Sequence, residues 1–159
     1  MKKEQLGELI LSSQETMYHV AKTLLRSDED CADAIQETIV KAFSKLHTLR
    51  SDAYARTWLI RILINECYNC IRRNQRLVFL EEAPMQESGQ GQEDYSELYE
   101  AVSSLPEEVR LSVTLHYLEG YSIKEVAQLL DTTESAVKNR LMRARKRLRA
   151  ELTPEVAQG

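Results

Sequence analysis

Apolar residues recur at helical spacing through most of this chain, and the pattern predicts helices rather than strands. The first run covers residues 4–26. After an acidic turn at 27–30, a second run reaches about residue 46, and a third runs from about 53 to 76. Gly and Pro number only five and three, whereas strand-rich folds need many turns. The pattern therefore predicts an all-α protein.

The helical pattern stops in the stretch "EEAPMQESGQGQED", residues 81–94, which contains Pro, Ser, two Gly and three Gln. This composition is typical of a flexible acidic linker, although a long surface loop inside one domain is the alternative. We therefore expect two small helical domains, at 1–76 and 95–152, joined by a linker at 77–94 and followed by a tail at 153–159.

Capping signals divide the second half of the chain into four predicted helices. The first is residues 95–103. "SLPE" predicts a restart in which Ser104 caps and Glu107 completes a capping box, and that helix should end at Gly120. "SIKE" is a second capping box, with Ser122 and Glu125, and it begins a short helix that reaches residue 130.

A tight turn follows at residues 131–133, where Asp131 tolerates a left-handed backbone and Thr can cap the last helix, residues 134–152. A short helix, a tight turn and a further helix form a helix-turn-helix, whose second helix can enter a DNA major groove. Its apolar stripe at Val137, Leu141, Ala144 and Leu148 holds this helix to a small core.

Positive charge is concentrated on this last helix. Between residues 138 and 149, seven of twelve residues are Lys or Arg and none is acidic, although the chain carries a net charge of −4. Residues 81–100 are the reverse, with seven acidic residues and no basic one. Local fields matter more than the total charge, so a low pI does not exclude nucleic-acid binding. The alternative is a solvated basic helix, or one that pairs with the acidic linker. The candidate DNA contacts are Ser135, Lys138, Asn139, Met142, Arg143, Arg145 and Arg147.

A lone helix-turn-helix makes too few DNA contacts to bind a specific promoter tightly, so we expect either a dimer or a second DNA contact elsewhere in the chain. The stretch "ARTWLIRILINECYNCIRRNQR", residues 55–76, offers such a contact, because one of its faces interleaves aromatic, amide and guanidinium groups. That mixture suits melted DNA, whose bases stack on aromatic rings. Alternatively, Trp58 is core and the rest of the face is solvated. The candidates are Trp58, Arg61, Asn65, Asn69, Arg72 and Arg73.

The preceding helix, "DEDCADAIQETIVKAF", has an acidic and amide face opposite its apolar one. Asp30, Asp33 and Glu37 fall at i, i+3 and i+7, with Gln36 beside them. The functional interpretation is a docking surface for a basic protein partner. An ordinary solvated face is the alternative.

These three stretches together resemble the extracytoplasmic-function (ECF) group of bacterial RNA polymerase sigma factors. The likeness covers nearly the whole chain, including "LPEEVRLSVTLHYLEGYSIKEVAQLLDTTESAVKNRLMRARKRLR". It implies that Asp33, Gln36 and Glu37 dock on the β′ clamp helices of core RNA polymerase. It also implies that the residue 55–76 helix meets the −10 promoter element and that the last helix reads the −35 element. An anti-sigma factor is a further partner implied by the resemblance alone.

Three positions depart from the pattern of that group. Ala32 stands where an acidic residue is common, so docking should rely more on Asp30 and Asp33. Ile64 replaces a frequent Arg, and Asn69 replaces a frequent Asp. The last two changes bear on which −10 sequence is preferred.

The sequence offers no arrangement that suits catalysis. There is no Gly-rich phosphate loop, and the three His residues share no spacing with carboxylates. Cys67 and Cys70 form a lone C-x-x-C inside a helix, which is read as two core residues rather than as a zinc site or a redox switch. We therefore predict a non-enzyme with no cofactor, no metal and no small-molecule substrate.

No apolar run exceeds four residues, so no membrane insertion is expected and the predicted location is the cytoplasm. Two rival functions remain at this point. A dimeric helix-turn-helix regulator would bind duplex operators without polymerase and would not require the face at residues 58–76. A polymerase-binding decoy would tolerate the loss of Lys138 and Arg143.

Overall fold

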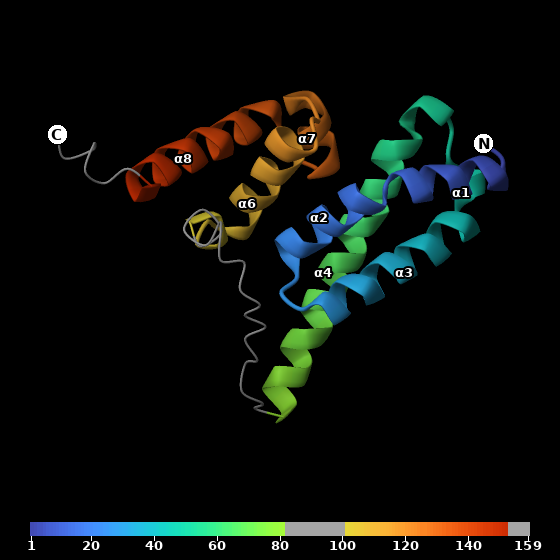
Figure 1. Ribbon diagram of the computed structural model, residues 1–159, viewed down its shortest axis with the longest axis horizontal. Helices are drawn as coiled ribbons and strands as arrows, with labels where there is room; N and C mark the ends of the chain where they lie inside the picture. The colour runs from blue at the N-terminus through green and yellow to red at the C-terminus, as the bar shows by residue number, and fades with distance from the viewer. Residues whose placement is uncertain (82–100, 153–159) are drawn as a thin grey trace. The chain divides into compact units, whose positions relative to one another are not determined.

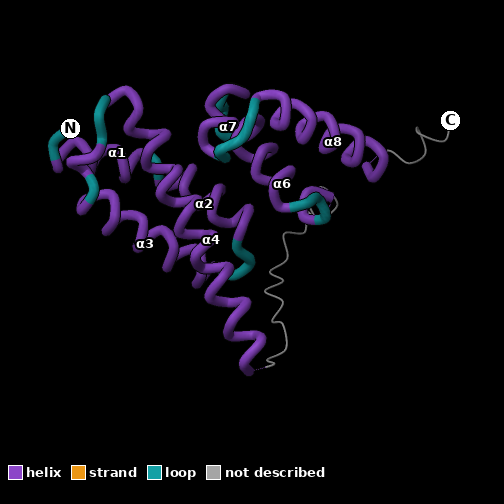
Figure 2. The backbone as a smooth tube through the Cα atoms, turned by 180° about the vertical axis from the view of Figure 1, so that it is seen from behind, coloured by secondary structure: helices purple, strands orange, loops and turns teal. Residues whose placement is uncertain are grey.

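The computed structural model describes residues 1–81 and 101–152, and the chain divides into two compact units, 1–88 and 89–159. All regular structure in the described residues is helical, which confirms the predicted all-α class (Figures 1 and 2). The tail and most of the predicted linker lie outside these residues. So does most of the helix predicted at 95–103, of which residues 101–103 are helical.

Helices α2, α3 and α4 form the centre of the first unit: α3 packs against α4, and α2 contacts both (Figure 1). Fully buried apolar side chains from α1, α2 and α4, among them Leu6, Met17 and Leu63, form the core. The elements are α1 (Lys3–Ser12), α2 (Gln14–Leu24), α3 (Asp28–Ser44), the short 3₁₀ helices Leu46–Thr48 and Asp52–Tyr54, and α4 (Ala55–Glu81).

The single helix predicted at residues 4–26 is wrong, because the chain breaks at Ser13 between α1 and α2. The Ser12 hydroxyl donates to the Leu9 carbonyl at 3.0 Å, and the Ser13 N–H bonds to Ile10 O, three residues back. Serine hydroxyls compete for backbone acceptors in this way, and serine pairs are a common cause of helix breaks. The apolar period continues across the break, so the sequence pattern did not reveal it.

The buried face of α3 consists of small side chains. Cys31, Ala34, Thr38 and Ala42 are buried, and the Thr38 hydroxyl is satisfied by the Ala34 carbonyl at 2.7 Å. Small residues at successive turns let α3 and α4 approach closely. Phe43, a large apolar residue near the end of α3, is 38% exposed. Helix α4 also continues to Glu81, past residue 76, where the sequence ended the helix and began the linker.

In the second unit, α8 packs on α6 and α7 around the fully buried Leu111, Val126 and Val137. The elements are α6 (Glu107–Val113), a π-helical segment (Thr114–Leu118), α7 (Ile123–Leu129) and α8 (Glu134–Leu152). The predicted stripe of α8 is largely confirmed: Val137, Leu141 and Ala144 are buried, while Leu148 is half-buried.

Local chemistry defines the turns of the second unit. Ser122 and Glu125 form the predicted capping box, with bonds of 2.8 and 3.1 Å. Asp131 adopts the left-handed backbone, φ 56°, and the Thr133 hydroxyl accepts the Ala136 N–H at 3.0 Å. These contacts confirm the turn of the helix-turn-helix.

The capping box predicted at Ser104 and Glu107 is wrong. Pro106 occupies the N-cap position of α6, and the Ser104 hydroxyl donates to the Ala101 carbonyl at 2.8 Å. Ser104 therefore satisfies the end of the preceding helical turn rather than the beginning of α6.

Two glycines give opposite predictions for stability. Gly120 lies just after the π-helical segment with φ +78°, whereas Gly7 lies inside α1, and a Cβ at either position meets nothing within 4 Å. Gly120→Ala should therefore destabilise the second unit by about 1–2 kcal/mol through backbone strain alone. Gly7→Ala should stabilise the first unit by about 1 kcal/mol. Thermal unfolding checks both; a stabilising Gly120→Ala would contradict the positive φ.

Candidate nucleic-acid interfaces

A groove of about 670 Å³ runs between α3 and α4 of the first unit. Carboxylate and amide groups of α3 form one wall, and amide and guanidinium groups of α4 form the other. The structure therefore brings together residues that the sequence assigned to two separate surfaces. The lining residues are Asp33, Ala34, Gln36, Glu37, Lys41, Glu66, Asn69, Arg72, Arg73 and Arg76.

The remaining candidates on α4 lie nearer its N-terminus and outside the groove lining. Trp58 and Arg61 are half-buried and Asn65 is exposed, at turn spacings that place them on the same side of the helix as Asn69 and Arg72. Trp58 is thus neither a fully buried core residue nor a fully exposed ring. The mixed aromatic, amide and guanidinium face forms one stripe along α4.

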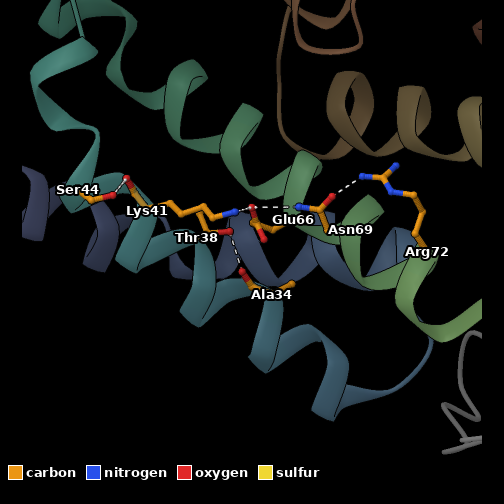
Figure 3. Close-up of polar contacts among 7 residues, drawn as sticks. All are labelled: Ala34, Thr38, Lys41, Ser44, Glu66, Asn69 and Arg72. Carbon is orange, nitrogen blue, oxygen red and sulfur yellow. Dashed lines mark hydrogen bonds and ion pairs between the residues drawn. The ribbon is translucent and has the colours of Figure 1, made fainter. Parts of the chain in front are cut away.

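A chain of polar contacts crosses the groove from α3 to α4 (Figure 3). Lys41 Nζ lies 2.5 Å from Glu66 Oε2, and Asn69 Nδ2 donates to the same oxygen at 3.4 Å. The Arg72 guanidinium donates to Asn69 Oδ1. Sequence reasoning missed Lys41 and Glu66; the only signal was Glu66, the single carboxylate of residues 55–76.

Asp30 plays a different part from the other acidic candidates of α3. Its side chain is half-buried and accepts a hydrogen bond of 2.9 Å from Asn74 Nδ2 of α4. Asp30 therefore ties the beginning of α3 to α4, whereas Asp33, Gln36 and Glu37 are exposed.

All three cysteines are free and buried within the first unit. Burial raises the pKa of Cys31 to about 11, and it also raises the pKa values of Cys67 and Cys70. The thiolate is the reactive form, so these thiols are poor nucleophiles at neutral pH. Within residues 1–81 and 101–152, no group of three His, Cys, Asp or Glu side chains is arranged to hold a metal.

The folded protein should therefore resist thiol reagents. Near pH 8, we expect an aromatic disulfide reagent to modify Cys31 about 100-fold more slowly than an exposed thiol, because less thiolate is present. Full denaturation should release all three cysteines to the reagent. Rapid modification of any thiol in the native protein would contradict their structural role.

The second candidate interface is the exposed side of α8. All seven residues predicted to contact DNA are exposed, including Met142 at 47%. The Arg145 side chain has a partner outside α8, because its guanidinium donates to Tyr117 Oη at 2.7 Å. Tyr117 comes from the π-helical segment and lies edge-on to His116, whose Nδ1 is 2.8 Å from the Tyr121 carbonyl oxygen. On the other side of α8, Arg140 pairs with Glu108 at 3.6 Å.

None of the described helices combines the length and the apolar character needed to cross a membrane.

The two units match two family descriptions in order. Residues 9–77 match Sigma-70 region 2, and residues 95–148 match Sigma-70, region 4. The chain is 27% identical to RNA polymerase sigma factor SigV of Bacillus subtilis over 163 residues, which covers 98% of each chain. It is 31% identical to ECF RNA polymerase sigma factor SigM of Mycobacterium tuberculosis over 144 residues, which covers 89% of this chain and 74% of SigM.

Solved structures show the same fold. The sigma factor RpoE of Bartonella quintana, solved in complex with the anti-sigma factor NepR, superposes with a TM-score of 0.83 at 24% identity, covering 94% of this chain and 98% of that one. CnrH, solved in complex with the cytosolic domain of CnrY, gives 0.72 at 24% identity, covering 96% and 90%.

Proposed function

This chain belongs to the extracytoplasmic-function family of RNA polymerase sigma factors, and we propose that its two units divide promoter recognition between them. The chain is a transcription initiation factor that binds core RNA polymerase and directs it to specific promoters. The first unit binds polymerase and melted −10 DNA, and the second unit binds the −35 duplex. Polymerase carries out RNA synthesis, and this chain adds no catalytic group.

One observation carries the proposal: the region 2 match contains the α3–α4 groove, and the region 4 match contains the helix-turn-helix. Asp33, Gln36 and Glu37 are exposed on α3 and suit a basic protein surface such as the β′ clamp helices. The stripe of α4 supplies stacking and phosphate-binding groups for a separated strand. The exposed face of α8 supplies donors to base edges and phosphates of a duplex.

Reconstitution tests this function directly. The purified chain is mixed with core polymerase that lacks any sigma factor, passed over a gel-filtration column and then supplied with fragmented genomic DNA from the source. Co-elution with polymerase and discrete new transcript starts are expected. If the chain elutes alone, as a dimer that shifts duplex DNA, it is an ordinary helix-turn-helix regulator instead.

We also propose that an anti-sigma factor holds the chain inactive. This proposal is supported by the two solved relatives above: RpoE is in complex with the anti-sigma factor NepR, and CnrH is in complex with the cytosolic domain of CnrY. Because polymerase and promoter DNA are its targets, the proposed location is the cytoplasm. Affinity chromatography on the immobilised chain, with polymerase as a competitor, should recover a protein whose binding excludes polymerase.

A further inference from the structure

We propose that Asn69 positions Arg72 rather than reading DNA itself, and that Lys41 and Glu66 fix the orientation of Asn69. This inference rests on the proposed function of α4 as the helix that meets the −10 DNA. It assigns direct contact with the strand to Arg72. It makes Lys41 and Glu66, which the sequence analysis did not single out, positioning residues for promoter melting.

The orientation of the Asn69 amide follows from the chemistry of its two neighbours. An ionised carboxylate can only accept hydrogen bonds, and a guanidinium can only donate them. Asn69 lies between one of each, so its Nδ2 must face Glu66, at 3.4 Å, and its Oδ1 must face Arg72. Both polar groups of Asn69 are engaged within the protein, so one N–H and one lone pair of its amide remain, and their direction is set by Glu66 and Arg72.

Glu66 is itself held in place from the opposite wall of the groove. Only 6% of its side chain is exposed, and its Oε2 lies 2.5 Å from Lys41 Nζ of α3 (Figure 3). A buried carboxylate needs such a partner, because an unpaired charge is strongly disfavoured away from water. The position of Asn69 is therefore set by the packing of α3 on α4, not by α4 alone.

Arg72 is the exposed end of this chain of contacts, and its hydrogen bond to Asn69 restricts a side chain that is otherwise flexible. The remaining N–H donors of the guanidinium stay available to a ligand. A guanidinium held in one place loses less rotamer freedom when it binds. Its natural ligands are a phosphate oxygen or a base-edge acceptor of single-stranded DNA.

Exchanging the two groups that orient Arg72 tests the proposal. In Glu66→Gln with Asn69→Asp, the introduced glutamine still accepts from Lys41 through its oxygen and donates its amide to the introduced aspartate, whose carboxylate still accepts from Arg72. Net charge is unchanged, and the chain of contacts is restored with the amide and the carboxylate exchanged. In Glu66→Gln alone, the glutamine amide turns Asn69 around and presents a donor to Arg72. In Asn69→Asp alone, two carboxylates face each other.

The measurement is the rate at which reconstituted holoenzyme forms the open complex on a promoter found by the genomic transcription experiment. The permanganate reactivity of unpaired thymines monitors this rate. Each single variant should lower the rate about 10-fold, the size of one lost hydrogen bond to a charged group. The exchanged pair should recover to within about threefold of the original chain. If Asn69 donates to a base through its own Nδ2 group, the introduced aspartate has no donor to offer that base, and the exchange cannot recover the rate.

Two further variants separate this inference from the function on which it rests. Arg72→Ala should slow open-complex formation, and adding Asn69→Asp to it should cost little more. Arg76→Ala removes a guanidinium that also lines the groove but lies about two turns from residue 69, outside the chain of contacts, so it should combine additively with Asn69→Asp. A large loss in Arg72→Ala without recovery in the exchanged pair would overturn the positioning role alone. No loss in Arg72→Ala would overturn the −10 assignment of α4 itself. Thermal unfolding of each variant separates these effects from misfolding.

Discussion

Lys138→Ala combined with Arg143→Ala is expected to abolish promoter-directed transcription while leaving core polymerase binding intact. Both side chains are exposed on α8, beyond the turn that Asp131 and Thr133 define. Each contact with a base edge contributes about 1–3 kcal/mol, so their joint loss should lower initiation by at least about 30-fold. Neither residue supports the core, and the unfolding temperature should change little.

The assay has two arms. Gel filtration with core polymerase reports binding, and transcription from a promoter that depends on this chain reports recognition. Where the residues contact phosphates, the slope of log affinity against log salt should also fall by about one for each contact removed. If the variant loses polymerase binding as well, the division of labour between the units is wrong.

A charge-matched control separates local contacts from a general loss of positive charge. Lys3→Ala with Lys45→Ala removes two exposed positive charges from the first unit, outside both candidate interfaces. This control should transcribe normally. An equal loss in the control would mean that total charge, and not α8, governs DNA affinity.

The features that sequence reasoning predicted well are those that depend on neighbouring residues. The capping box at Ser122, the left-handed Asp131 and the cap at Thr133 each involve residues three or fewer positions apart. Turns and caps form between residues that are close in the sequence, so a single sequence is enough to predict them. The same rule failed at Ser104, because Pro106 takes the N-cap position that the pattern assigned to Ser104.

The groove could not be predicted in the same way. Lys41 and Glu66 are 25 positions apart, and their pairing depends on how α3 and α4 align in the folded unit. The acidic face of α3 and the mixed face of α4 were both predicted as surfaces, but not as opposite walls of one groove. The structure also suggests why Asn69 suits this chain where the resemblance led us to expect Asp: an Asp would bring a second carboxylate against Glu66.

Asp33→Ala combined with Glu37→Ala is expected to weaken binding to core polymerase by about 10- to 100-fold, mainly through slower association. Both carboxylates are exposed on α3, so their removal should leave the stability of the unit almost unchanged. The effect should be largest near 0.1 M salt and shrink toward about 1 M, where screening shortens the range of charge interactions. Glu8→Ala with Glu15→Ala, two exposed carboxylates of α1 and α2, is the matched control and should bind normally.

The groove gives this variant a second, opposite signature. Asp33 and Glu37 line the groove with Arg72 and Arg73, so removing them leaves the basic wall with less negative charge beside it. The free chain should then bind a non-specific single-stranded oligonucleotide more tightly, while its affinity for polymerase falls. A misfolded variant would lose both activities, and a merely solvated acidic face would leave polymerase affinity unchanged. A fall in one affinity with a rise in the other is therefore the result that identifies α3 as the polymerase-docking wall of the groove.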